Sequence, residues 1–88
     1  MKLVVIYKAQ SEHGRATEDF LREIGGRMSG EQARVVDPDS REGATIAQLY
    51  DIWQYPAVIV TQENGAMQMM WLGEPLPLVS EVVAYLRA

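Results

Sequence analysis

The 88-residue chain contains no cysteine. It can therefore form no disulfide, present no thiolate nucleophile and bind no metal through sulfur. Histidine is almost missing too, because His13 is the only one in the chain. One imidazole without a cysteine cannot assemble a zinc site, so the composition predicts no metal and no cofactor.

Basic residues are scarce as well. Eight Lys and Arg stand against twelve Asp and Glu, which gives a formal net charge of −4. The basic residues are scattered along the chain, whereas a nucleic-acid-binding domain needs a basic stripe and a membrane-surface patch needs a basic cluster. The composition therefore predicts that the partner is neither a nucleic acid nor a membrane.

The chain also lacks long apolar runs. The apolar run at residues 3–7 is shorter than the core of a signal peptide and far shorter than a membrane span, so we expect a cytoplasmic protein. Hydrophobic residues nevertheless make up 48% of the chain, which is typical of a folded core. A chain of this length predicts one domain, residues 1–88.

One stretch of the chain organises the rest. Residues 55–60 read YPAVIV, a mostly β-branched run that is too short for a helix and suits a strand buried on both faces. Because proline cannot donate to a sheet ladder, Pro56 belongs at the start of that strand. A cis bond is plausible at a Tyr-Pro step, so the sequence leaves the isomer of Tyr55–Pro56 open.

Three further strands and three helices are expected around this stretch. The other strands are residues 3–7, 33–37 and 66–72, and the short, more polar 33–37 segment suits a place near an edge. The predicted order is β-α-β-α-β-β-α, an α/β fold with a mixed four-stranded sheet and helices on both faces. Right-handed crossovers place the first strand between the second strand and the Pro56 strand, with residues 66–72 as an antiparallel edge.

The first helix is expected to start at Ser11, a good N-cap residue, and to end near Gly25–Gly26 or at the latest at Ser29–Gly30. Residues four apart predict its apolar stripe, namely Ala16, Phe20, Ile24 and Met28. An Asp37–Ser40 turn, with Asp39 or Ser40 as the cap, leads into a second helix that runs to about Ile52. Its apolar face consists of Ile46, Leu49, Tyr50 and Trp53.

The remaining local predictions concern aromatic residues and turns. Trp53 is expected to fill the core and Tyr55 to be partly exposed. Asn64–Gly65 favours a type I′ hairpin turn, and Pro77 suits the first position of a last helix. That helix has a clear apolar face, formed by Val79, Val82, Val83 and Leu86.

The ordered set of elements resembles the thioredoxin-like fold in its small, glutaredoxin-sized form, over essentially the whole chain. Residues 4–7 lead into a loop and a long helix, and an acidic turn at residues 37–39 follows the second strand. Residues 55–58 are similar to the family's cis-proline segment. Gly65 and the later Gly73 match the family's hairpin glycine and the glycine before its last helix.

The resemblance breaks at the redox centre. The family's Cys-x-x-Cys pair corresponds here to Ser11-Glu12-His13-Gly14, so both sulfurs are missing. Disulfide exchange needs an attacking thiolate and a leaving sulfur, and a serine hydroxyl supplies neither at neutral pH. The oxidoreductase activity that the resemblance would imply is therefore excluded by composition. Ser11 and His13 also lack a placed acid, so no catalytic triad is predicted.

The end of the fold that corresponds to the family's redox centre is still expected to bind a partner. The expected site combines the helix start, the Tyr55–Pro56 turn and the glycine before the last helix; its residues are Ser11, Glu12, His13, Gly14, Arg15, Tyr55, Pro56 and Gly73. The main hypothesis is a redox-inactive module that binds an unknown protein or peptide without catalysis.

Two alternatives belong to other classes. One is a glutathione or small-thiol binding protein with transferase-like chemistry, carried by Ser11, Arg15 and the Val58 side of the proline turn. The other is a structural homo-oligomer, a homodimer through the hairpin edge formed by residues 66–72.

Overall fold

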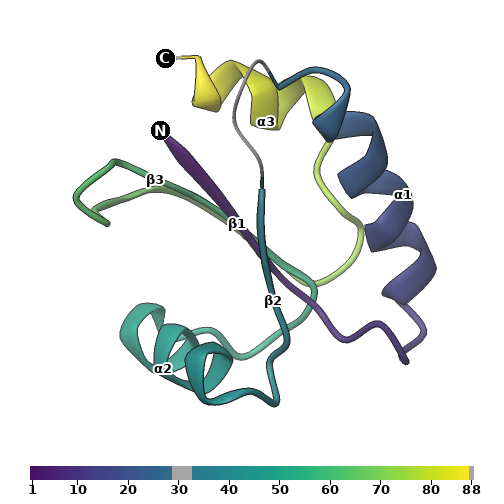
Figure 1. Cartoon of the computed structure of the whole chain (residues 1–88), viewed down its shortest axis with the longest axis vertical. Coiled ribbons are helices and arrows are strands. Elements are labelled where there is room, and N and C mark those ends of the chain that lie inside the picture. Colours follow the sequence, from purple (N-terminus) through teal and green to yellow (C-terminus); the bar gives the residue numbers. More distant parts are fainter. Residues whose placement is uncertain (29–32, 88) are drawn as a thin grey trace.

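The computed structural model describes residues 1–28 and 33–87. Its elements follow the predicted order β-α-β-α-β-β-α (Figure 1). They are β1 (Lys2–Ile6), α1 (Gly14–Gly25), β2 (Arg34–Val36), α2 (Arg41–Tyr50), β3 (Ala57–Thr61), β4 (Met67–Leu72) and α3 (Val79–Leu86). Within the described ranges no helix is long and apolar enough to cross a membrane.

The four strands form one mixed sheet in the order β2-β1-β3-β4. β1 runs parallel to β2 and antiparallel to β3, and β4 runs antiparallel to β3. This arrangement confirms the mixed four-stranded sheet, the place of the first strand and the edge position of the hairpin strand.

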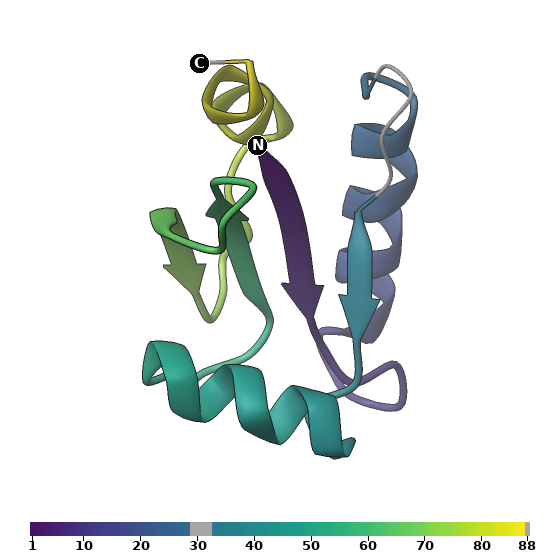
Figure 2. The same ribbon diagram turned by 60° about the vertical axis from the view of Figure 1, so that its left-hand side comes forward.

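Helices cover both faces of the sheet, as expected (Figures 1 and 2). One apolar cluster joins alternate residues of β1 and β3 to α1 and α3, and a second joins the other residues of these strands to the α2 side. β3 is buried along its whole length because its side chains belong to both clusters. The β-branched run that opens at Pro56 is thus the two-sided centre of the core.

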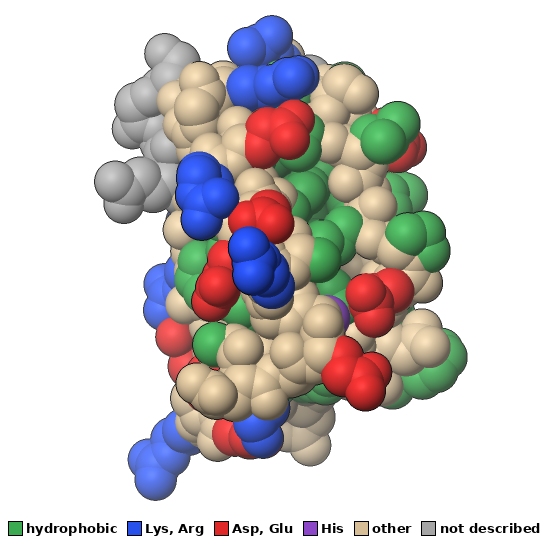
Figure 3. All heavy atoms as spheres, turned by 90° about the vertical axis from the view of Figure 1, so that its right-hand side faces the viewer, with side chains coloured by type: hydrophobic (Ala, Val, Ile, Leu, Met, Phe, Trp, Pro, Cys, Tyr) green, Lys and Arg blue, Asp and Glu red, His purple; other side chains and the backbone are tan. Residues whose placement is uncertain are grey.

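The apolar stripe of α1 differs from the prediction at one position. Phe20 and Ile24 are buried as expected, but Ala16 is exposed and Thr17 takes its place in the core. Thr17 can be buried because its hydroxyl donates to the carbonyl of His13 at 2.7 Å. The outer face of α1 carries charges of both signs (Figure 3), including the ion pairs Arg22–Asp19 and Arg27–Glu23.

The end of α1 agrees with the prediction, but its start needs correction. The helix ends at Gly25 with Gly26 as its cap, which agrees with the earlier of the two predicted stops; the later stop, Ser29–Gly30, lies outside the described residues. Ser11 does not cap the start. The N-cap is His13, without a side-chain cap bond, and the Ser11 hydroxyl donates to the carbonyl of Lys8 instead.

Ser40 is the true serine cap of this fold. Its Oγ accepts a hydrogen bond from the amide of Gly43 at 2.9 Å, as the Asp39-or-Ser40 hypothesis allowed. We expect Ser40→Ala to lower the free energy of unfolding by about 1 kcal/mol, because it leaves a helix amide without its partner. Ser11→Ala should cost less, since no helix amide depends on it. Urea unfolding of both variants measures the difference in stability, and equal losses of stability would contradict the assignment of Ser40 as the cap.

The second helix is shorter than predicted. α2 ends at Tyr50, because Asp51 adopts the left-handed conformation with φ 58° and stops the helix. Ile52 then turns into the core, but Leu49 and Trp53 stay 70% and 72% exposed. The prediction that Trp53 fills the core is therefore wrong. Tyr55 is half-buried, which confirms that it is partly exposed.

Two turns differ in detail. In the hairpin only Gly65 has a positive φ, and its amide donates to the carbonyl of Gln62 at 2.9 Å. A type I′ turn needs two positive φ angles, so the loop is instead a three-residue turn that closes on Gly65. The last helix begins at Val79 with Leu78 as its N-cap, so Pro77 precedes the helix. Its predicted apolar face is confirmed by the burial of Val79, Val82 and Val83.

Candidate functional site

The topology brings four loops to one end of the sheet. Ile6 lies opposite both Val36 and Ala57, and Ala57 lies opposite Leu72. The carboxyl ends of β1, β2 and β4 and the amino end of β3 therefore meet there. We call this region the sheet-end surface, formed by residues 7–13, 37–40, 53–56 and Gly73. It contains six residues of the predicted site, and the other two, Gly14 and Arg15, follow it in the first turn of α1.

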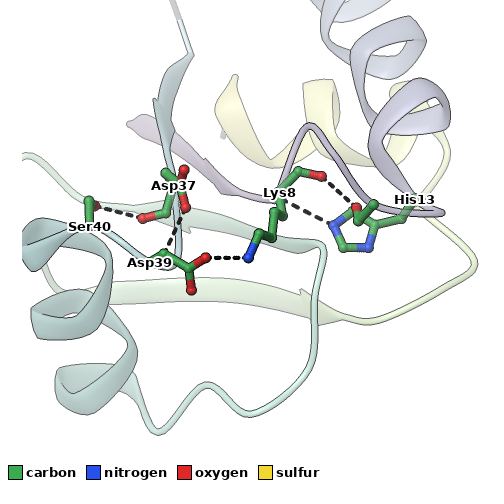
Figure 4. Close-up of polar contacts among 6 residues, drawn as sticks. Lys8, His13, Asp37, Asp39 and Ser40 are labelled. Atoms are coloured by element: carbon green, nitrogen blue, oxygen red, sulfur yellow. Dashed lines mark hydrogen bonds and ion pairs between the residues drawn. The ribbon is translucent and has the colours of Figure 1, made fainter.

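The loop after β1 closes on its own backbone (Figure 4). The amide of Lys8 donates to Nε2 of His13 at 3.2 Å, and the Ser11 hydroxyl donates to the Lys8 carbonyl. Ser11 and His13 thus bond the same peptide backbone and not each other. Among the residues that the structure describes, no serine and histidine form the kind of pair that activates a nucleophile.

A chain of polar contacts joins this loop to the loop after β2 (Figure 4). Nζ of Lys8 forms an ion pair with Asp39, whose amide donates to Oδ1 of Asp37 at 2.8 Å. The Ser40 hydroxyl donates to the carbonyl of Asp37 at 2.6 Å. The hydrogen bond and the negative charge of Asp39 raise the pKa of Lys8. The acidic turn thus leads into the helix cap, as its sequence predicted, and it also joins two loops, which the sequence did not indicate.

Tyr7 and His13 border the same loop. Their rings meet edge to face, with centroids 6.4 Å apart and planes at 62°. The Tyr7 hydroxyl lies 3.4 Å from Oε2 of Glu18 on α1. Burial, and then the negative charge and hydrogen bond of Glu18, raise the pKa of Tyr7 above the ordinary value of 10.0. Tyr7 therefore stays neutral at physiological pH and serves as a hydrogen-bond donor.

The other half of the surface is built by the Pro56 and Gly73 segments. The amide of Gly73 donates to the carbonyl of Pro56 at 2.9 Å, and the side chain of Gln54 lies against Gly73. The Tyr55–Pro56 and Glu74–Pro75 peptide bonds are both cis. These contacts join the segment before β3 to the segment after β4.

The predicted site residues differ in exposure. Ser11, His13 and Tyr55 are half-buried, and Glu12 and Arg15 are exposed. The other three, Gly14, Pro56 and Gly73, are buried. A strip of apolar side chains lies beside α1 on the face shown in Figure 3. Among the residues described, no group of three His, Asp or Glu side chains could hold a metal ion.

Trp53 is the surface residue that sequence reasoning missed. Its spacing from Ile46 and Leu49 indicated a helix face, but α2 ends before it and its indole is left in water. The Pro56 step downstream was the available indication, because the residue before a proline is extended and a helix cannot easily continue to it.

The exposure of Trp53 can be measured directly, because the chain has only two tryptophans. Trp71 packs edge to face on Tyr85, with ring centroids 5.5 Å apart, and is half-buried. We expect the Trp71→Phe variant, which keeps Trp53, to emit at longer wavelength and to be quenched more strongly by acrylamide than the Trp53→Phe variant. Equal quenching of the two variants would contradict the exposed position.

Comparison with solved structures identifies the class of fold. The structure is similar to that of thioredoxin 1 from the thermophilic eubacterium Thermosipho africanus TCF52B, with a TM-score of 0.70. The match covers 99% of this chain and 91% of that chain, at 15% sequence identity. The chain thus has a thioredoxin-like fold, as its sequence indicated, and it lacks the Cys-x-x-Cys motif. No protein-family model and no curated protein matches the sequence.

Proposed function

We propose that this chain is a redox-inactive thioredoxin-like domain that binds a protein or peptide through the sheet-end surface. The observation that carries the proposal is the pair of aromatic side chains just before Pro56. Trp53 is 72% exposed and Tyr55 is half-buried. Exposed tryptophan and tyrosine are favoured anchors of protein interfaces, because they offer a large apolar area with few rotatable bonds.

The absence of reactive groups at this surface supports binding over catalysis. The chain has no cysteine, and the Ser11 hydroxyl and His13 imidazole are both engaged by the Lys8 backbone. A nucleophile needs a hydrogen-bonded base, and none is in place. The site residues therefore serve as contacts and not as reacting groups.

The loops of the sheet-end surface are held together by contacts within the chain. The Lys8–Asp39 ion pair ties the first two loops, and the Gly73–Pro56 hydrogen bond ties the last two. A surface that is ordered in advance loses less conformational entropy on binding. A partner can thus be recognised by a fixed arrangement of apolar and polar groups.

A cross-linking pull-down from native lysate tests the proposal. The bait carries a photo-cross-linking group at Gln54, between the two aromatics, and the test variant is Trp53→Glu with Tyr55→Glu. The matched control is Leu78→Glu, since Leu78 is 68% exposed but lies at the start of α3. We expect a captured protein to be lost only in the test variant. Equal capture by all three baits would overturn the placement of the binding surface.

Glutathione binding is the competing function at the same surface. It would require a free Ser11 hydroxyl, and that group already donates to the Lys8 carbonyl. We therefore expect no heat when glutathione is titrated into the protein in a calorimeter. Saturable heat that is lost in the Ser11→Ala variant would contradict protein binding as the function of this surface and support small-thiol binding instead.

A further inference from the structure

The second candidate surface is the outer edge of the sheet, which is independent of the sheet-end surface. β4 is the last strand in the order β2-β1-β3-β4, and in Figure 2 no helix or strand lies beyond it. An edge strand presents a row of backbone donors and acceptors that can pair with another strand. Nothing else in the described part of the chain pairs with this side of β4.

The hydrogen-bond pattern shows which residues present these groups. The amide of Gly73 donates to the carbonyl of Pro56, so the Gly73–Pro56 pair is a hydrogen-bonded one. Bonded and non-bonded pairs alternate along an antiparallel ladder. The backbone groups of Trp71 and Met69 therefore point toward β3, and those of Met70 and Leu72 point to the free edge.

The two edge strands of the sheet, β2 and β4, differ in the features that protect a strand from pairing with another chain. β2 has three residues and starts with Arg34, which forms an ion pair with Glu42. β4 has six residues, MQMMWL, with neither a charge nor a proline. Natural edge strands are usually blunted by shortness, charge, proline or a bulge. β4 has none of the first three, and the irregularity in its pairing with β3 lies at Thr61 and Met67, away from Met70 and Leu72. A strand of this kind is suited to pairing.

We infer that β4 pairs antiparallel with β4 of a second copy of this chain, which makes one continuous eight-stranded sheet. The distribution of charge favours contact between two copies of the chain at the β4 edge and disfavours contact at its other surfaces. The chain carries a net charge of −4, so contact between most of its surfaces brings carboxylates together. The strand from Met67 to Leu72 is uncharged, so pairing it with itself opposes no like charges.

The pattern of outward groups also defines a register. Placing Met70 of one copy opposite Met70 of the other forms a hydrogen-bonded pair on a two-fold axis, because both residues direct their backbone groups outward. The axis stands perpendicular to the sheet, so α1 and α3 of both copies lie on the same face. Such an interface is closed and predicts a dimer, not a fibre.

Sedimentation velocity over a concentration series up to the millimolar range tests this inference. We expect the mass to rise from 9.9 kDa toward twice that value. Gln68→Lys adds a charge to the edge through an exposed side chain, and Met70→Pro removes one outward amide. Each variant should weaken the dimer at least about tenfold.

The matched control is Val35→Lys, which adds the same charge at the opposite edge, where Val35 is 51% exposed. The control should dimerise as the wild type does. A one-chain mass for the wild type at all concentrations would overturn the inference, and so would a dimer that survives Gln68→Lys or is lost in Val35→Lys. Circular dichroism checks that each variant folds. If Met70→Pro fails to fold, Gln68→Lys decides.

Discussion

Replacement of Gly14 or Gly43 by alanine is expected to lower the free energy of unfolding by about 3 kcal/mol, the upper end of the usual cost of overpacking. A Cβ on Gly14 would lie 2.2 Å from the carbonyl oxygen of Ala9. A Cβ on Gly43 would lie 2.1 Å from the carbonyl oxygen of Asp37. Both obstacles are backbone atoms, which cannot rotate away as a flexible side chain can.

The two glycines play the same part in two loops. Each lies in the first turn of a helix and packs against the loop that leads into it, after β1 for Gly14 and after β2 for Gly43. Alanine would push each loop away from its helix and disturb the sheet-end surface as well. The loss is a large share of the stability of a domain this size, which is on the order of 10 kcal/mol.

Urea unfolding followed by circular dichroism measures the effect, with Gly25→Ala as the matched control. Gly25 is also in α1, but a Cβ there meets nothing within 4 Å. Since alanine favours a helix over glycine by up to about 1 kcal/mol, the control should be neutral or stabilising. A Gly14→Ala variant as stable as the wild type would show that Gly14 does not pack closely on Ala9.

The second large effect is expected from Ile59→Ala, which should destabilise the fold by about 2–5 kcal/mol. Ile59 is fully buried in the central strand β3 and belongs to the cluster on the α2 side. Its truncation removes apolar contacts and leaves a cavity that the surrounding β-branched residues cannot close without moving the sheet. Chemical denaturation gives the difference in free energy.

Leu49→Ala is the matched control for the same face of the sheet. Leu49 has the spacing of a core residue, but it is 70% exposed. Its truncation should therefore change stability by no more than about 0.5 kcal/mol. A large loss in Leu49→Ala would mean that its side chain is buried and would contradict the exposure seen here.

Much of the fold was predictable because it depends on regular patterns. The β-branched runs at residues 3–7 and 55–60 alternate their side chains between two apolar clusters, and this requires helices on both faces. The period of the last helix placed Val79, Val82 and Val83 in the core correctly. Patterns of this kind reflect burial averaged over many residues, so an error at one position leaves the architecture unchanged.

Single positions were harder to predict, because they depend on contacts between distant segments. Ser11 has the chemistry of an N-cap, but its hydroxyl bonds the Lys8 carbonyl and the helix starts three residues later, at Gly14. Thr17 is buried because a backbone carbonyl of the preceding turn satisfies its hydroxyl. The local conformational propensity of a residue does not indicate such competing hydrogen-bond partners.

The sequence by itself determined the order of the elements and the absence of thiol groups, because periodicity and composition are properties of the chain alone. Its resemblance to thioredoxins indicated the architecture that the structure then showed. Only the tertiary structure decided that Trp53 is exposed, that Lys8 ties two loops through Asp39, and that the Ser11 hydroxyl bonds the Lys8 carbonyl. Each of these depends on which segments become neighbours when the sheet assembles. Exposure and pairing are relations between distant parts of the chain, so spacing along one segment cannot determine them.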